Sequence, residues 1–187
     1  MDPFIETYDK LFAGRRDVYA KGYPDPNKPE KYRYATVREA LTPQVLAQHF
    51  KGDMCVGVYP LVENKVSWFA IDFDAPKGLA EDTSLEQMFD ITFEAGKAQL
   101  VAFEKAGLQV YLERSRSGKG IHVWGFLSEP MLADTVRRAL KPLLTDHSIY
   151  TSRDRMYPVQ PSTSGLDEGL GNLIALPFFG DVRHLGF

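Results

Sequence analysis

Apolar side chains recur with two different periods in the N-terminal third of the chain, and these periods predict a small α/β module. Residues 4–12 have the period of a short helix, after which a basic, proline-rich loop is expected. Thr42 is expected to cap a second helix, with Pro43 at its first position. Two continuous apolar runs, 54–61 and 66–73, flank a short polar segment and predict a β-hairpin.

From residue 66 onward, strand-like and helix-like periods alternate in a regular order. Ser84 and Gln87 have the spacing of a capping box, which marks the start of a long helix. The expected elements, in chain order, are a strand at 66–74, a helix from Ser84 to Gly107, strands at 108–114 and 121–127, a helix that opens at Ser128 and Pro130 and ends near Pro142, and a strand at 172–178. This β-α-β-β-α-β order is that of the split βαβ fold, in which the first and third strands pair in an antiparallel sheet.

The predicted fold class is therefore α+β, with a split β-α-β-β-α-β (RRM-like) core and a small N-terminal α/β module. We expect a single domain over residues 1–187, in which the module at 1–60 packs on the core at 61–187. With 187 residues, 44% of them hydrophobic, the chain can bury a core without a disulfide or a structural metal. Its single cysteine, Cys55, lies in an apolar run, so an internal disulfide and a Cys-rich zinc site are excluded.

Charge is unevenly distributed along the chain. The formal net charge is −3, which by itself argues against a nucleic-acid partner. Residues 61–104 contain nine acidic and three basic side chains, whereas the rest of the chain contains 16 acidic and 19 basic ones. Bound divalent cations would offset part of the acidic segment. No apolar stretch has the length of a transmembrane helix and the polar start is no signal peptide, so a cytoplasmic protein without a membrane partner is expected.

Two carboxylates end the predicted strand at 66–74. Asp72 and Asp74 are two residues apart, so their side chains point to the same face of a sheet. Such a pair repels itself unless a cation lies nearby, and Mg²⁺ prefers carboxylate oxygens. His122 begins the strand expected beside this one, so it should lie next to the pair. Two acids at a solvent-facing strand end are the alternative interpretation.

The loop between the strands at 108–114 and 121–127 combines two glycines with hydrogen-bond donors. The glycines let the backbone approach an anion, while Ser117, Lys119 and His122 supply donors. The pattern is not a Walker loop, because GxxxxGK[ST] is absent. An ordinary Gly-Ser turn with a buried structural histidine is the alternative. The predicted fold favours a phosphate site, because it brings this loop and the aspartates to one face.

The sequence resembles the archaeo-eukaryotic primase superfamily, particularly bacterial primase-polymerases of the conflict-system and CRISPR-associated type. The segments that carry the resemblance, in the order of the family, are GRRDVY (14–19), GVYP (57–60), WFAIDFD (68–74), LERSRSGKGIHVW (112–124), SEP (128–130), DRMYP (154–158) and GNLIALP (171–177). Together they span nearly the whole chain. Relatives of the conflict-system type often carry a Cys-rich insertion after the first segment, and this chain has none.

The resemblance implies a set of metal ligands and catalytic residues. Asp72 and Asp74 match the first catalytic motif of the family, and His122 belongs to the second. A third motif supplies one more acidic ligand, for which we choose Asp154, with Asp146 as the alternative. These acids are expected to hold two Mg²⁺ or Mn²⁺ ions.

The resemblance also implies a grip on the triphosphate of the substrate. Ser117, Lys119 and His122 match the family motif that binds the incoming nucleotide. Arg114 and Arg116 flank this loop and are expected to contact phosphate or template, although charges at strand ends are also found simply solvated.

The activity implied is that of a template-directed DNA or RNA primase-polymerase. Such an enzyme transfers nucleotides from (d)NTPs to a 3′-hydroxyl and releases pyrophosphate. Single-stranded DNA template and primer are the expected partners, with a helicase or another domain in cis or in trans. Two alternatives are a non-catalytic single-stranded nucleic-acid binding domain of the replication-initiator type and a metal-dependent phosphodiester hydrolase.

Overall fold

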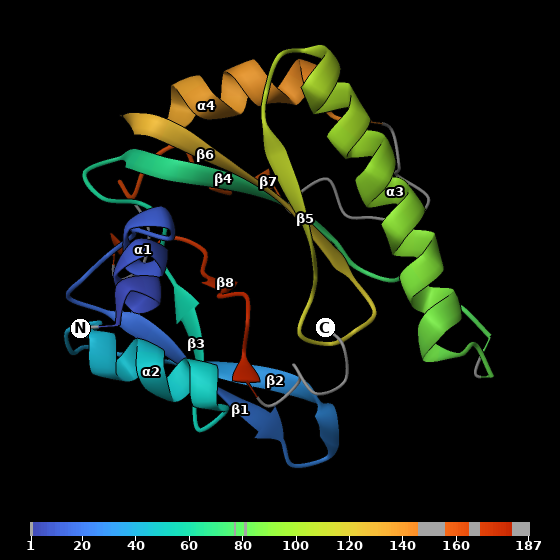
Figure 1. Cartoon of the computed structure of the whole chain (residues 1–187), viewed down its shortest axis with the longest axis horizontal. Coiled ribbons are helices and arrows are strands. Elements are labelled where there is room, and N and C mark those ends of the chain that lie inside the picture. Colours follow the sequence, from blue (N-terminus) through green and yellow to red (C-terminus); the bar gives the residue numbers. More distant parts are fainter. Residues whose placement is uncertain (1, 77, 81, 146–155, 165–168, 181–187) are drawn as a thin grey trace.

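The computed structural model describes residues 2–76, 78–80, 82–145, 156–164 and 169–180 (Figure 1). The helices of this part are α1 (Pro3–Leu11), α2 (Pro43–Lys51), α3 (Leu85–Lys105), α4 (Ala133–Leu140) and the 3₁₀-helix η1 (Lys141–Leu143). The strands are β1 (Tyr19–Asp25), β2 (Lys28–Val37), β3 (Cys55–Val58), β4 (Lys65–Phe73), β5 (Val110–Arg114), β6 (Ile121–Leu132), β7 (Met156–Tyr157) and β8 (Ile174–Ala175). The fold class is α+β, as predicted, with two four-stranded antiparallel sheets.

The first sheet has the strand order β2-β1-β3-β8, with α1 and α2 beside it (Figure 1). Helix α1 lies within one residue of its predicted bounds. Helix α2 begins as predicted: Thr42 Oγ1 accepts a hydrogen bond from the Val45 amide at 3.4 Å, and Pro43 occupies the first position. Gly52 ends this helix in the left-handed conformation, at φ 87°.

Two predictions for the N-terminal part are wrong. The expected proline-rich loop is instead the β1–β2 hairpin, in which Pro24 lies beside a register shift near the turn, where a missing N–H is tolerated. The runs 54–61 and 66–73 do not pair as a hairpin, because β3 belongs to the first sheet and β4 to the second. Both runs are continuously apolar because each strand is buried on both faces, which is typical of central strands.

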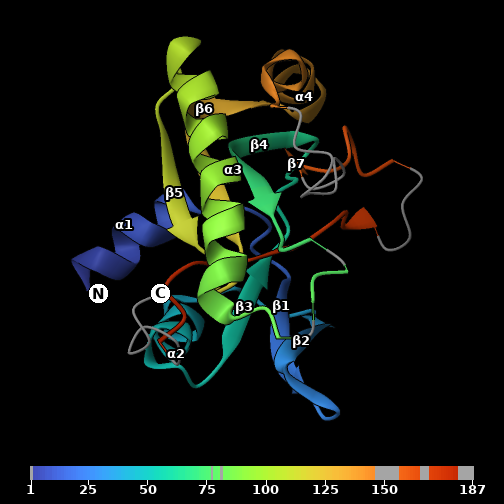
Figure 2. The same cartoon turned by 90° about the vertical axis from the view of Figure 1, so that its right-hand side faces the viewer.

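The second sheet has the strand order β5-β6-β4-β7, with β4 and β6 as antiparallel neighbours at its centre, as predicted. Helices α3 and α4 cover one face of it (Figure 2). The capping box of α3 is present, with the Ser84 amide donating to Gln87 Oε1 at 2.8 Å and the Gln87 amide donating to Ser84 Oγ at 3.2 Å. No helix in the described ranges combines the length and the apolar content that a membrane span requires.

Two further predictions are wrong in the C-terminal half. Strand β6 continues to Leu132, so α4 begins at Ala133 and not at Ser128. Pro130 lies where β6 has passed the end of β5 and where its register with β4 shifts, so its missing N–H disrupts no regular ladder. The fourth strand of the second sheet is β7, and the predicted strand at 172–178 shortens to β8, which pairs with β3 in the first sheet.

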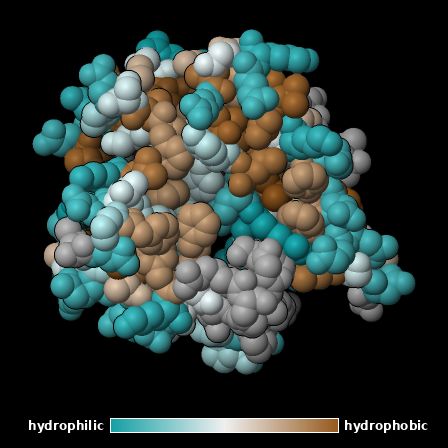
Figure 3. Space-filling model, viewed as in Figure 1, coloured by the Kyte–Doolittle hydropathy of each residue, from teal (hydrophilic) through white to brown (hydrophobic). Residues whose placement is uncertain are grey.

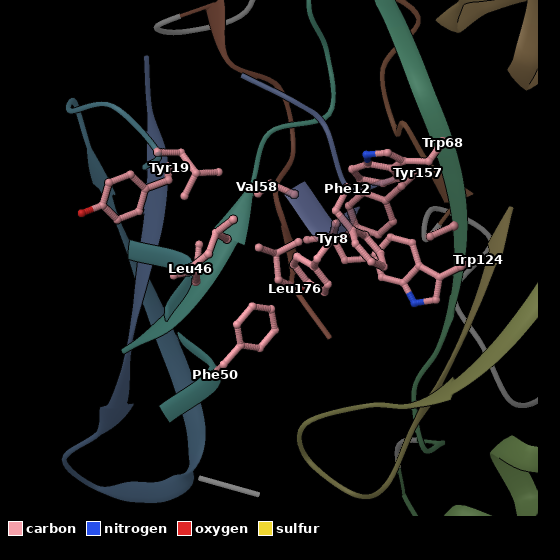
Figure 4. Close-up of a cluster of buried hydrophobic side chains, with 14 of the residues drawn as sticks. Tyr8, Phe12, Tyr19, Leu46, Phe50, Val58, Trp68, Trp124, Tyr157 and Leu176 are labelled. Carbon is pink, nitrogen blue, oxygen red and sulfur yellow. The ribbon is translucent and has the colours of Figure 1, made fainter. Parts of the chain in front are cut away.

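Alternation along β4 assigns its side chains to two cores. Phe69, Ile71 and Phe73 pack under α3 and α4. Trp68 and Ala70 point the other way, into an aromatic core shared with α1, α2 and the first sheet (Figure 4). Asp72 continues the second set, so it lies on the face of the sheet that meets the N-terminal part of the chain.

Gly125 of β6 lies opposite Phe69 of β4 and leaves no room for a side chain. A Cβ atom at position 125 would lie 2.1 Å from Cζ of Phe69, whose ring is buried against Phe103. We expect Gly125→Ala to lower the free energy of unfolding by about 1–3 kcal/mol, measured by urea denaturation. Phe69→Leu should make the same change less costly, and equal costs in the two backgrounds would contradict this steric explanation.

Candidate active site

Three polar side chains form a row across the second sheet, on the face that carries Trp68. Asp72 on β4 pairs with His122 on β6, and His122 pairs with Glu113 on β5. The prediction that His122 lies beside Asp72 is therefore confirmed by the strand register. All three side chains are largely shielded from solvent, with exposed fractions of 8%, 9% and 16% for Asp72, His122 and Glu113.

The imidazole of His122 lies between two carboxylates. Its Nδ1 is 2.6 Å from Oε2 of Glu113, and its Nε2 is 3.5 Å from Oδ1 of Asp72. The indole Nε1 of Trp124 donates to the same Glu113 oxygen at 2.9 Å. Glu113 was not among the predicted site residues. The short connection between its strand and that of His122 was a usable signal, because a tight hairpin fixes which residues face each other.

The surroundings of His122 favour its charged form. Burial of the imidazole on its own lowers the pKa, but the charges and hydrogen bonds of Glu113 and Asp72 outweigh burial and raise the pKa well above its usual value. His122 is thus held as an imidazolium that offsets part of the negative charge of its two neighbours.

Asp72 and Asp74 supply hard oxygen donors at the end of β4. Asp72 is buried, and Asp74, one residue past the strand, is exposed. Carboxylates are the ligands that Mg²⁺ and Mn²⁺ prefer, so the chemistry of the pair fits such ions. Within the described ranges, no group of three or more His, Cys, Asp or Glu side chains is placed to hold a metal ion. Asp154 and Asp146, the two candidates for a third acid, lie outside the described residues.

The loop that follows β5 is shaped by Ser115. The Ser115 amide donates to the Gly120 carbonyl at 2.8 Å, and the Gly118 amide donates to the Ser115 carbonyl at 2.8 Å. Ser115 Oγ accepts from the Gly120 amide at 3.2 Å. Thr92 of α3 donates to the carbonyl of Lys119 at 2.9 Å and ties the loop to that helix. These hydrogen bonds define the backbone conformation of the loop without a ligand.

Ser117 and Lys119 differ in what remains available for a ligand. The Ser117 hydroxyl is 3.1 Å from Ser115 Oγ and accepts from the Lys119 amide at 3.3 Å, so it also maintains the loop. The Lys119 ammonium has no hydrogen bond or ion pair within the part of the chain that the structure describes. Among the described residues, no carboxylate competes with an anion for the charge of Lys119.

The two arginines beside this loop point to different places. Arg114 pairs with Ile121 and so faces α3, on the side of the sheet opposite His122. It donates to the Gly118 carbonyl and to Glu86, both at 3.0 Å, and lies 3.8 Å above the ring of Phe89. The structure does not bring Arg114 to the face of Asp72.

Arg116 connects the loop to the first sheet. Its guanidinium lies 3.6 Å above the ring of Tyr32 on β2. The loop therefore contacts both α3 and the first sheet, since Thr92 holds it to α3 and Arg116 packs on Tyr32 of β2.

A pocket of about 380 Å³ opens beside Glu113 and Trp124. Its other walls are apolar and come from α1, β5, β6 and the segment after β8, namely Leu11, Phe12, Tyr111, Leu112, Phe126, Pro177 and Phe178. The space-filling view shows the surface hollowed near its centre, between hydrophobic and hydrophilic residues (Figure 3). The row formed by Asp72, His122 and Glu113 is thus bordered, at Glu113, by a pocket with mainly apolar walls.

The sequence matches the family described as "TOTE conflict system, Archaeo-Eukaryotic Primase domain" over residues 4–186. The chain belongs to this primase family. The resemblance noted from the sequence motifs is thereby confirmed. Among solved structures, the polymerase domain of Mycobacterium tuberculosis ligase D in complex with DNA is similar at a TM-score of 0.44 and 16% identity, over 74% of this chain and 56% of that one. No curated protein matches the sequence.

Proposed function

We propose that this member of the primase family is a template-directed primase-polymerase, which transfers nucleotides from (d)NTPs to a 3′-hydroxyl and releases pyrophosphate. The observation that carries the proposal is that Asp72 and His122 lie side by side at the end of the second sheet where the Lys119 loop joins β5 to β6. Carboxylates for metal ions lie there next to cations for phosphate, which is the pairing that nucleotidyl transfer requires. Membership in the primase family supports the same conclusion.

We propose that residues 1–187 act as one catalytic domain, with an RRM-like core at 61–187 and an N-terminal module at 1–60 packed on it. The continuous aromatic core that joins α1 and the first sheet to Trp68 and Trp124 supports a single domain (Figure 4). Single-stranded DNA template, primer and (d)NTPs are the proposed partners, with a helicase or a further domain in cis or in trans.

Asp72, Asp74 and Asp154 are the proposed ligands of two divalent cations. When bound, Mg²⁺ or Mn²⁺ lowers the pKa of the attacking hydroxyl and stabilises charge on the departing pyrophosphate. The contribution of the chain is to fix the ligands. Asp72 is held within the sheet, opposite His122, and Asp74 extends past the strand end toward solvent.

His122 and Lys119 are the proposed cationic contacts of the triphosphate. The imidazole is held by Glu113 beside Asp72, so it would lie at the border between metal ions and phosphate. The loop backbone is fixed by Ser115, which presents the Lys119 side chain without a competing ion pair in the described residues. Ser117 contributes mainly by holding the loop shape.

Lys119→Ala is expected to raise the KM for the nucleotide by roughly 10- to 100-fold with a smaller change in kcat. A hydrogen bond to a charged group contributes about 1.5–3 kcal/mol, which corresponds to such a factor. Initial rates of primer extension at varied nucleotide concentration measure this. Lys97→Ala removes the same charge from an exposed position on α3 and should change neither constant. An unchanged KM for Lys119→Ala would remove Lys119 from the nucleotide site.

A metal titration separates the proposed function from its two alternatives. Purified protein, labelled nucleotides and a primed single-stranded template should yield extended primers with Mn²⁺ or Mg²⁺ and none with EDTA. Affinity for the template without metal-dependent incorporation would instead indicate a non-catalytic binding domain. Shortened template or primer strands would indicate a phosphodiester hydrolase.

A further inference from the structure

Glu113 is the one acidic residue of β5, and none of the functions proposed above requires it to touch a substrate. Its carboxylate nevertheless lies beside the proposed triphosphate site, where an uncompensated negative charge would repel the nucleotide. The carboxylate is turned toward His122 and Trp124, and one oxygen, Oε2, receives both of their N–H groups, at 2.6 and 2.9 Å. The negative charge of Glu113 is therefore paired with His122.

The contact with Glu113 determines how His122 is oriented. A carboxylate oxygen at 2.6 Å from Nδ1 requires a proton on that nitrogen, which leaves Nε2 as the nitrogen on the side of Asp72. A hydrogen-bond partner on one ring nitrogen fixes the rotation of the ring. Because the imidazolium has a proton on each nitrogen, Nε2 keeps an N–H to donate. Without Glu113, the imidazole would lose the acceptor of its Nδ1–H and could rotate.

Glu113 is itself held by the aromatic core. Trp124 donates to it, and the rings of Phe12 and Trp68 pack edge-on or steeply tilted against Trp124, at centroid distances of 5.0 and 5.2 Å. The ring of Trp124 also meets that of His122 at 85°. Through Trp124 and Glu113, the aromatic core that joins α1 to the second sheet thus also fixes the orientation of His122.

We propose that Glu113 is a positioning residue, which holds His122 so that Nε2 donates to the phosphates of the bound nucleotide. This inference rests on the proposed function, because it takes the triphosphate to be the partner of His122. Glu113 acts only through the histidine and does not contact the nucleotide. A purely structural carboxylate would affect folding but not the dependence of nucleotide affinity on His122.

The test combines nucleotide binding with imidazole NMR. Dissociation constants for a non-hydrolysable nucleoside triphosphate are measured with Mn²⁺ for wild type, Glu113→Ala, Glu113→Gln, His122→Ala and the double variant Glu113→Ala/His122→Ala. The expected loss is roughly tenfold for Glu113→Ala, by analogy with the loss of about 10- to 100-fold on removing the carboxylate partner of a metal-binding histidine. Glu113→Gln keeps an oxygen acceptor and should lose less than Glu113→Ala. In the His122→Ala background, Glu113→Ala should cause no further loss.

Glu94→Gln, an exposed acid on α3, is the matched control and should bind nucleotide as wild type does. Should Glu113→Ala fail to fold, Trp124→Phe provides a second variant, because it keeps an aromatic ring at this position, leaves Glu113 in place and removes the indole donor to Glu113. Its expected loss of affinity is about threefold, again only when His122 is present.

Imidazole NMR of the nucleotide-free protein tests the orientation without any activity. In the wild type, the Nδ1–H of His122 should give a protected downfield proton signal, which is retained in Glu113→Gln and lost in Glu113→Ala. Two results would overturn the positioning role alone. In the first, Glu113→Ala binds nucleotide as wild type does although His122→Ala binds it more weakly. In the second, Glu113→Ala causes the same loss of affinity with His122 present and with His122→Ala. Unchanged affinity for His122→Ala itself would overturn the proposed triphosphate grip, and with it this inference, even if the NMR signal is present.

Discussion

Asp72→Asn is expected to reduce nucleotide incorporation by roughly three orders of magnitude while the fold stays intact. The proposed role of Asp72 is to bring a negative oxygen to the metal ions, and metal ions contribute several kcal/mol of charge stabilisation in the transition state. At about 1.4 kcal/mol for each factor of ten, that loss corresponds to the expected change in rate. Asparagine has nearly the same shape, so the strand pairing with His122 should persist.

Rates of primer extension under Mn²⁺, compared with thermal unfolding curves, measure the effect of Asp72→Asn. Asp74→Asn should also reduce the rate strongly, because the second carboxylate belongs to the same proposed ligand set. Asp90→Asn is the matched control, since it removes the same charge from an exposed position on α3. A rate near that of the wild type for Asp72→Asn would rule out the proposed metal site.

Trp68→Ala is expected to lower the free energy of unfolding by about 3–5 kcal/mol, the range for removing a fully buried large aromatic residue. Trp68 is 0% exposed, and its indole N–H donates to the carbonyl of Ala13 at 2.8 Å. Its ring also packs against Trp124. The substitution therefore leaves a cavity and an unsatisfied carbonyl where the two sheets share their core.

Urea denaturation measures the change for Trp68→Ala. Tyr111→Ala, on β5 of the same sheet, is the matched control, because Tyr111 is 50% exposed and its removal should cost less than about 1 kcal/mol. Similar costs for the two variants would mean that the shared aromatic core contributes little to holding the sheets together.

The parts of the fold that could be predicted are those set by local signals. Thr42 and Ser84 mark helix starts through hydrogen bonds to residues three positions away, which the sequence displays directly. The pairing of Asp72 with His122 follows from the order of long strands with clear patterns. Local chemistry and topology together were enough to place Asp72 and His122 side by side in the candidate site.

The parts that could not be predicted depend on contacts distant in sequence. Strands β7 and β8 have two residues each, too few for any period, and only the partners β4 and β3 decide which sheet each one joins. Arg114 was expected to contact phosphate or template because it flanks the loop in which Ser117 and Lys119 were expected to bind phosphate. The strand register turns it to the opposite face, where Glu86 and Phe89 of α3 meet it.

Incorporation of a single nucleotide opposite a chosen template base tests the central claim most directly. Wild-type protein with Mn²⁺ is mixed with four primer–templates that differ only in the first templating base, and each is offered all four nucleotides separately. The proposed primase-polymerase should extend each primer with the complementary nucleotide, and Asp72→Asn should extend none at a comparable rate. No extension by the wild type on any template, or extension that ignores the templating base, would contradict the account.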